Sequence, residues 1–130
     1  MHEVFKMKLE NIQPSQLYIS NNKLSLVLSW LNEENNFEYG PIPVKRLNGK
    51  VIFTDGHTRA KALYDLGFEF INVAWDNEEL SWDAYQICVD WCLDKNITSI
   101  ADFSDRVLCD SDYDQLWNER CDVMHEELGI

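Results

Sequence analysis

The sequence has no hydrophobic run long enough to cross a membrane. Its apolar stretches fall well short of the roughly 20 residues that a transmembrane helix needs. The first residues lack the charged and then apolar layout of a signal peptide. No internal repeat, low-complexity segment or linker rich in proline and serine is visible. These absences predict a cytoplasmic protein without membrane association.

Basic residues are also scarce. The chain holds 11 Lys and Arg against 23 Asp and Glu, which is a net charge of -12. Residues 1–75 contain 8 of each sign, whereas residues 76–130 contain 3 basic and 15 acidic residues and carry the whole imbalance. Because proteins bind DNA largely by neutralising phosphates with Lys and Arg, direct binding of duplex DNA is not expected. The acidic part is interpreted as a solvated surface, and a basic protein partner for it is the alternative.

Cysteine is absent from the chain before Cys88. The spacing between Cys88 and Cys92 is one helical turn, not the two-residue gap of a zinc knuckle. We therefore expect four reduced thiols, packed as small apolar side chains, and no metal. The alternative is a zinc site formed by Cys88, Cys92, Cys121 and His125.

The chain does contain enough apolar material for a core. Its apolar fraction is 45%, with 12% aromatic residues, which is too apolar for a disordered acidic tail. The length of 130 residues suits one domain, and the break in charge near Asp76 is the only candidate boundary. We therefore predict an α+β domain over residues 1–75, with an acidic helical extension over residues 76–130 that packs on it to form one compact unit.

The first part begins with a predicted strand and a predicted helix. The pattern of Met7–Ile12 indicates a short strand that ends before Pro14. An amphipathic helix follows, with Asn21 or Asn22 as its expected cap. Its apolar positions are Leu24, Val27, Leu28 and Leu31. The polar stretch Asn32–Glu38 is predicted to be a loop.

A hairpin, a helix and a strand complete the first part. The β-branched runs Val44–Leu47 and Val51–Thr54 flank Asn48-Gly49, a pair that favours a tight hairpin turn because both positions tolerate positive φ. A short helix is expected from His57 to Leu66, with Gly67 as its stop. Phe68–Trp75 is predicted to be a further strand.

The second part is predicted to be helical. Ser81 is a suitable cap for one helix, and the pairs Ser99 with Asp102 and Ser111 with Asp114 indicate capping boxes for two more. An apolar stripe along the last helix predicts that it packs against the first part. The stripe consists of Tyr113, Leu116, Trp117, Cys121, Met124 and Leu128.

The segment whose residues are best suited to bind a ligand or to catalyse a reaction is the loop from Asp55 to Arg59, where a strand leads directly into a helix. The first backbone N–H groups of a helix have no partner within it and carry partial positive charge, so they attract anions. Gly56 allows a ligand to approach the backbone closely. Arg59 offers a planar fork that suits phosphate or carboxylate.

The remaining side chains of this loop add polar groups. His57 titrates near neutrality or donates to a phosphate oxygen, and Thr58 adds a hydroxyl. Asp55 is suited to accept a proton from a substrate hydroxyl or to hold a metal. The same residues also fit an ordinary helix start, in which Asp55 caps the helix and Gly56 forms the turn. The residues alone leave these two interpretations open.

Several motifs in the first part match one known superfamily. They are Leu9–Pro14, Pro43–Lys45, Val51–Leu63, Leu66-Gly67 and Ile71–Val73. With these motifs, the span from about Lys8 to Trp75 resembles the ParB/sulfiredoxin-like superfamily. The resemblance implies a small mixed sheet with helices, to which residues 76–130 add a C-terminal helical extension.

Two activities of that superfamily depend on residues that this chain lacks. Sulfiredoxins use a cysteine within the loop, whereas here Gly56 is followed directly by His57. ParB partition proteins bind CTP at this loop, bind DNA through a separate domain, and carry an arginine in the stretch that corresponds to Pro14–Ser20. That stretch has no arginine here. A partition role is therefore disfavoured, whereas nucleotide binding remains compatible.

The loop is most similar to that of superfamily members that phosphorylate free serine. Their loop reads Asp-Gly-His-His-Arg, and this chain differs from it at Thr58 alone. Those kinases also use an acidic residue from an early loop as the base. The corresponding stretch, Gln13–Asn22, has no Asp or Glu, although Glu10 is close in sequence. A chain that keeps the phosphate-binding loop without the base would bind a nucleotide and not turn it over.

The sequence therefore predicts that the Asp55–Arg59 loop binds a nucleotide, such as ATP, ADP or CTP with Mg²⁺, or another phosphorylated ligand. By the resemblance, Gly56, His57, Thr58 and Arg59 are the phosphate-binding residues, and Asp55 and His57 are the candidate catalytic residues. Phosphotransfer to a small molecule is one possible outcome of such binding. The alternatives are a regulatory or interaction module that uses the acidic extension, and a protein related to chromosome partition. Whether the protein is an enzyme stays open.

Overall fold

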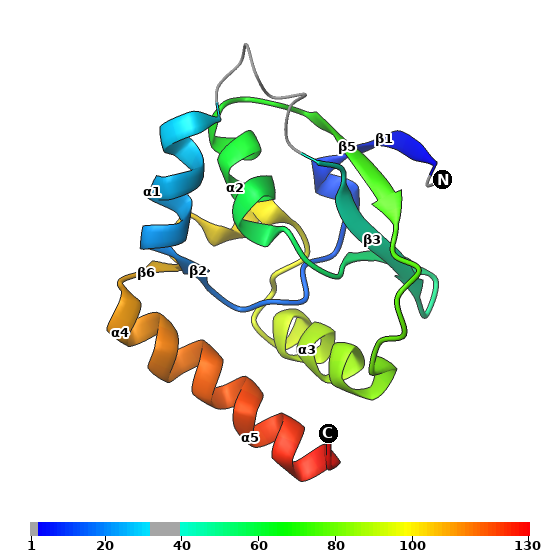
Figure 1. Ribbon diagram of the computed structural model, residues 1–130, viewed down its shortest axis with the longest axis vertical. Helices are drawn as coiled ribbons and strands as arrows, with labels where there is room; N and C mark the ends of the chain where they lie inside the picture. The colour runs from blue at the N-terminus through cyan, green and yellow to red at the C-terminus, as the bar shows by residue number, and fades with distance from the viewer. Residues whose placement is uncertain (1–2, 32–39) are drawn as a thin grey trace.

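A mixed four-stranded sheet organises the first part of the chain (Figure 1). The computed structural model describes residues 3–31 and 40–130. The strand order is β1-β5-β3-β4, in which β3 and β5 are parallel and the other neighbouring pairs are antiparallel. The strands are β1 (Val4–Lys8), β3 (Ile42–Leu47), β4 (Lys50–Phe53) and β5 (Phe70–Trp75).

The predicted hairpin is confirmed. Strands β3 and β4 pair so that Leu47 faces Lys50, which leaves two residues for the turn. Asn48 and Gly49 both have positive φ, 50° and 80°, as a two-residue turn of this kind requires. The hairpin delivers the chain from β4 directly to the candidate loop.

The strand predicted over Met7–Ile12 is wrong in its bounds. Strand β1 starts earlier and ends at Lys8, and a 3₁₀ turn over Leu9–Asn11 follows it. Leu9 and Ile12 are both buried, and this three-residue spacing fits a turn better than an alternating strand. The predicted loop Asn32–Glu38 lies outside the described residues.

Two helices of the first part, α1 (Asn21–Trp30) and α2 (His57–Asp65), contact each other beside the sheet (Figure 1). The predicted cap of α1 is one residue out. Ser20 caps the helix by accepting a hydrogen bond from the backbone N–H of Lys23, because Ser20 still has the extended backbone of strand β2 (Ile19–Ser20). Gly67 is confirmed as the stop of α2, with a φ of 94°, although the helix ends at Asp65, one residue before the predicted Leu66.

The second part consists mainly of helices, as predicted, but it also contributes a strand. Its elements are α3 (Trp82–Asp94), a 3₁₀ turn (Ile100–Phe103), β6 (Val107–Leu108), α4 (Asp110–Tyr113), a π-helical segment (Asp114–Asn118) and α5 (Glu119–Leu128). Strand β6 pairs in parallel with β2 (Ile19–Ser20). This small second sheet joins the two parts of the chain through their backbones.

Two of the three predicted helix caps in the second part are confirmed. Ser81 accepts a hydrogen bond from the backbone N–H of Ala84, and Ser99 with Asp102 forms a capping box. The box predicted at Ser111 is wrong. Helix α4 already starts at Asp110, so Ser111 lies inside the first turn and cannot cap it.

Residues from both parts share one hydrophobic core. Phe53 and Leu63 belong to the same buried cluster as Ile97, Phe103 and Trp117. None of the helices in the described residues combines the length and the hydropathy that a membrane span requires.

The cysteines are placed less uniformly than predicted. Cys88 and Cys92 are buried and Cys121 is half-buried, whereas Cys109 is exposed because it precedes α4 at the surface. Within residues 3–31 and 40–130, no three His, Cys, Asp or Glu side chains are placed to hold a metal ion. The alternative zinc site of the sequence analysis is therefore not assembled.

Candidate functional site

The candidate loop is held in place by hydrogen bonds at Thr54, just before Asp55. The backbone N–H of Thr54 donates to the carbonyl of Pro43 at 3.2 Å, and its hydroxyl donates to Asp76 Oδ2 at 2.7 Å. The hydroxyl of Tyr85, on α3, donates to the carbonyl of Thr54 at 2.8 Å. The entrance of the loop is thus fixed from the sheet and from the acidic extension together.

Gly56 is required at its position for two reasons. Its φ is 79°, in the left-handed region that side chains disfavour. A Cβ at this position would also lie 3.0 Å from Nη2 of Arg59 and 3.0 Å from Cγ2 of Ile42. The glycine therefore lets the Arg59 guanidinium lie directly against the backbone where α2 begins.

The start of α2 has no side-chain cap among the described residues. Gly56 occupies the cap position, and its carbonyl accepts the first helical hydrogen bond, from Ala60 at 2.9 Å. Asp55 does not cap the helix, because its Oδ1 accepts from the adjacent N–H of Gly56 at 2.8 Å. The first amides of α2 are thus left without the side-chain acceptor that usually satisfies them.

Arg59 stays beside this helix start. Its Nη1 donates to the carbonyl of Gly40 at 3.1 Å, which holds the guanidinium across Gly56. A guanidinium has five N–H donors, so one such bond leaves donors for a ligand.

A cavity of about 400 Å³, called here the α2 cavity, opens at the start of α2. Its lining brings together Arg59 and Lys23, the latter with Nζ 5.6 Å from the ring centroid of Tyr113. Asp55 is the only carboxylate among the described residues that line it. The remaining lining residues are Gln16, Leu26, Val27, Gly56, His57, Thr58 and Tyr113.

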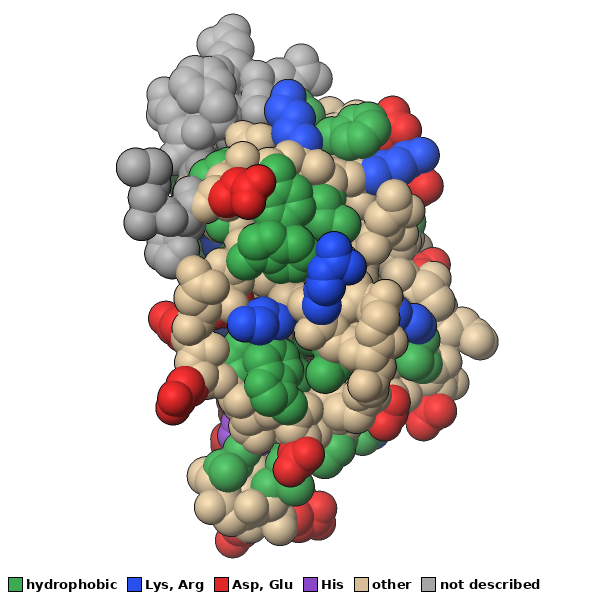
Figure 2. All heavy atoms as spheres, turned by 90° about the vertical axis from the view of Figure 1, so that its right-hand side faces the viewer, with side chains coloured by type: hydrophobic (Ala, Val, Ile, Leu, Met, Phe, Trp, Pro, Cys, Tyr) green, Lys and Arg blue, Asp and Glu red, His purple; other side chains and the backbone are tan. Residues whose placement is uncertain are grey.

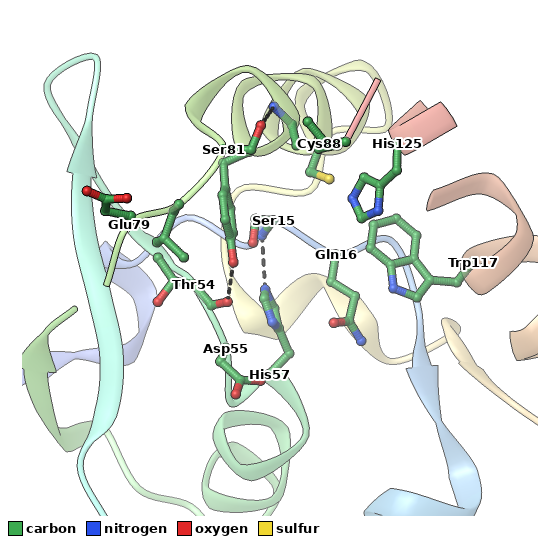
Figure 3. A pocket seen from close by; sticks show the side chains of 14 residues that line it. Ser15, Gln16, Thr54, Asp55, His57, Glu79, Ser81, Cys88, Trp117 and His125 are labelled. Atoms are coloured by element: carbon green, nitrogen blue, oxygen red, sulfur yellow. Dashed lines mark hydrogen bonds between the residues drawn. The ribbon is translucent and has the colours of Figure 1, made fainter. Parts of the chain in front are cut away.

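His57 is not positioned to donate a hydrogen bond to a phosphate oxygen. Its side chain is buried, and Nε2 accepts a hydrogen bond from the backbone N–H of Ser15 at 3.0 Å (Figure 3). Burial lowers the pKa of His57 from 6.5 to about 4, with Asp55 acting in the opposite direction. The imidazole is therefore neutral near pH 7, and its accepting nitrogen is already used. Its side chain fastens the Ser15 segment to the start of α2.

The loop residues and Glu10, the acidic residue nearest in sequence to the expected base, lie at opposite ends of α2. Asp55, Gly56, Thr58 and Arg59 all line the α2 cavity. Glu10 lines a separate hollow with Asp65, at the C-terminal end of the helix. Because a helix rises about 1.5 Å per residue, the two ends of the nine-residue helix α2 lie about 13 Å apart. Glu10 is therefore too remote to act as a base at the loop.

Three contributors to the site carry no motif and were missed from the sequence. Lys23 comes from α1, and Tyr113 comes from the acidic extension. Gln16 also lines the cavity, and its Nε2 donates to the Tyr113 hydroxyl at 3.1 Å and to the carbonyl of Tyr18 at 2.7 Å. The helical spacing of Tyr113 indicated burial and gave no sign of a cavity.

Other basic side chains lie elsewhere. Figure 2 shows a face on which Lys and Arg side chains lie beside apolar ones. Lys45 Nζ lies 5.6 Å from the ring centroid of Trp82, and Arg46 Cζ lies 5.2 Å from that of Trp75. Neither of these two cations lines the α2 cavity.

The sequence matches no protein-family model and no curated protein. The fold is similar to that of protein Atu1540 from Agrobacterium tumefaciens, with a TM-score of 0.50 and 15% identity over 75% of this chain and 51% of that one. It also matches SbnI with a C-terminal truncation from Staphylococcus aureus (TM-score 0.46, 19% identity, 58% of this chain and 31% of that one). A third match is a Pnob8-like ParB-N domain (TM-score 0.45, 16% identity, 70% of this chain and 37% of that one).

These similarities concern the fold, because the identities are below 20%. The match to Atu1540 supports a similar fold over three quarters of this chain. The mixed sheet, the helices beside it and the C-terminal helix confirm the predicted α+β class. This chain spans about half the length of Atu1540 and a smaller share of the other two proteins.

Proposed function

We propose that this protein binds a phosphate-bearing ligand in the α2 cavity, with a nucleotide as the first candidate. The observation that carries the proposal is the start of α2, which no side chain of residues 3–31 or 40–130 caps and which opens into a cavity that also contains Arg59 and Lys23. Free amides at a helix N-terminus together with a guanidinium form a favourable environment for phosphate oxygens.

Each part of the cavity suits a part of such a ligand. The first amides of α2, the Arg59 guanidinium and the Thr58 hydroxyl supply donors for phosphate oxygens, and Lys23 adds a second positive charge. Leu26 and Val27 offer an apolar surface for the rest of the ligand. A volume of about 400 Å³ lies within the usual range for small-molecule sites.

Mg²⁺ is compatible with this site. It is commonly held by one or two carboxylates and by the phosphates of its nucleotide. Asp55 supplies one exposed carboxylate at the edge of the cavity, with Oδ1 already accepting from Gly56. In a complex that binds the nucleotide without transfer, Asp55 would hold the ion, which neutralises phosphate charge when bound.

Phosphoryl transfer is the finer part of the proposal and depends on Asp55. Transfer would break the bond between the terminal phosphorus and its bridging oxygen and form a bond to an acceptor hydroxyl oxygen. The hydroxyl proton would pass to the Asp55 carboxylate. In an assay for phosphorylated product, we expect Asp55→Asn to abolish turnover while Arg59→Ala weakens ligand binding itself.

A thermal-shift experiment tests the binding. ATP, ADP and CTP, each with Mg²⁺, are added to the wild type and to Arg59→Ala and Lys23→Met. A ligand present at 100 times its Kd stabilises a protein by about 2.7 kcal/mol, and we expect both substitutions to reduce this gain. Arg46→Ala and Lys50→Met are the matched controls, because both residues are exposed and lie outside the α2 cavity.

The proposal is wrong if no nucleotide stabilises the wild type, or if Arg59→Ala responds as the wild type does. The first result would favour the alternative of an interaction module that uses the acidic extension.

A further inference from the structure

A second cavity lies on the other side of Asp55, between the loop and helices α3 and α5. Its volume is about 340 Å³, and it is called here the α3–α5 cavity. Figure 3 shows Cys88 entering it from α3, Trp117 and His125 from the C-terminal helical segment, and His57 from the loop. Ser81, the cap of α3, also lines it. The acidic extension therefore supplies most of its wall.

The two cavities differ in the charge of their walls. The α2 cavity contains Lys23 and Arg59. Among the described residues that line the α3–α5 cavity there is no Lys or Arg, whereas Asp55 and Glu79 are present. An anion would gain no partner of opposite charge in this second cavity, and a cation would gain the carboxylate of Asp55.

The pKa of Tyr85 reflects the carboxylates near the α3–α5 cavity. Its pKa is raised from 10.0 to about 12, first by burial and then by the nearby carboxylates, including Asp76 and Asp55. Tyr85 lines the cavity, and the part of this pKa shift that comes from Asp76 and Asp55 reflects negative charge around its hydroxyl.

The cavity also has aromatic walls that are held in place. Tyr85 is fixed by its hydrogen bond to Thr54, and Trp117 packs edge-on against Trp91 with ring centroids 6.0 Å apart. Ordered aromatic rings near a carboxylate form a surface that attracts organic cations, because the ring faces are electron-rich.

We propose that the α3–α5 cavity binds a small organic ammonium ion. Its apolar body lies against Trp117 and Tyr85, and its charged end meets Asp55. This second site goes beyond the phosphate site of the α2 cavity and does not depend on it, although the two cavities share Asp55, His57 and Gln16.

A series of three probes with the same shape and different charge tests the proposal. The probes are 2-phenylethylammonium, 2-phenylethanol and phenylacetate, titrated into the full chain without nucleotide. Binding is followed by NMR at pH 8, where histidine side chains are normally neutral. The indole N–H signal of Trp117, identified with Trp117→Phe, reports whether the probe enters this cavity.

We expect the ammonium probe to bind about fivefold to tenfold more tightly than the alcohol, and phenylacetate to bind most weakly, as one partly exposed ion pair allows. Asp55→Asn should remove the preference for the ammonium probe. Asp83→Asn should keep it, because Asp83 is exposed on α3 and does not line the cavity.

Equal affinities for all three probes in the wild type would overturn the proposal, as would an unchanged Trp117 signal at millimolar ammonium probe. The order of the three affinities is measured on the wild type alone, so a folding defect in Asp55→Asn would not affect it. A failure here would leave the nucleotide-dependent thermal shift of the α2 cavity unaffected, so the two proposals fail separately.

Discussion

The buried histidine of the loop leads to a defined dependence of stability on pH. His57 is 4% exposed, and its Nε2 accepts the backbone N–H of Ser15 at 3.0 Å. Protonation of the imidazole would place a charge in the core and replace this accepting nitrogen with a donor. We therefore expect the folded protein to resist protonation of His57 until about pH 4.

The magnitude follows from the difference between the folded and unfolded pKa of His57. A pKa lowered from 6.5 to about 4 corresponds to roughly 3 kcal/mol of folding free energy. Between these two pH values the unfolded chain binds a proton that the folded chain does not bind. The contribution is therefore fully present above about pH 6.5 and is lost as the pH falls towards 4.

Urea unfolding from pH 7.5 to pH 4 measures this contribution when the wild type is compared with His57→Gln. Glutamine keeps a side-chain acceptor for Ser15 and does not titrate. As the pH falls over this range, we expect the wild type to lose roughly 3 kcal/mol more unfolding free energy than His57→Gln. The comparison cancels the contributions of the carboxyl groups, because both proteins contain them. Parallel pH profiles, or an NMR titration of His57 centred near pH 6.5, would refute the reasoning.

Three further predictions concern local structure. In urea denaturation, Gly56→Ala should lower the unfolding free energy by about 1 kcal/mol more than Gly67→Ala. Both glycines have positive φ, but only at Gly56 would the added Cβ lie 3.0 Å from other atoms. Equal losses would contradict this. Ser99→Ala should lower stability by about 1 kcal/mol in the same assay through loss of the capping box. In thiol labelling of the native protein, Cys109 should react first and Cys92, which is 0% exposed, only after unfolding; early labelling of Cys92 would show that the core opens locally.

Local signals were predictable from the sequence. The hairpin was found because Asn48-Gly49 permits the positive φ that its turn needs, and the loop was found because a glycine and an arginine stand where a strand meets a helix. Both features depend on neighbouring residues in the chain. The bounds of β1 were missed because Met7–Ile12 was interpreted as one strand, although the three-residue spacing of Leu9 and Ile12 fits a turn.

The rest of the site depends on tertiary contacts. Lys23 and Tyr113 reach the α2 cavity from helices that have no sequence relation to the loop. The environment of His57 was also missed, because a histidine next to Gly56 suits a ligand site and a buried acceptor equally well. Only the packing of the Ser15 segment against α2 distinguishes the two.

The parallel pairing of β2 with β6 has a consequence for the order of folding. Arg106, next to β6, donates through its side chain to the carbonyl of Leu17, 89 positions earlier. Closing a loop of this length carries an entropic cost that must be met before the contacts it brings can form. During synthesis on the ribosome, the segment that leads into α1 therefore has to wait, without its strand partner, until most of the chain has emerged.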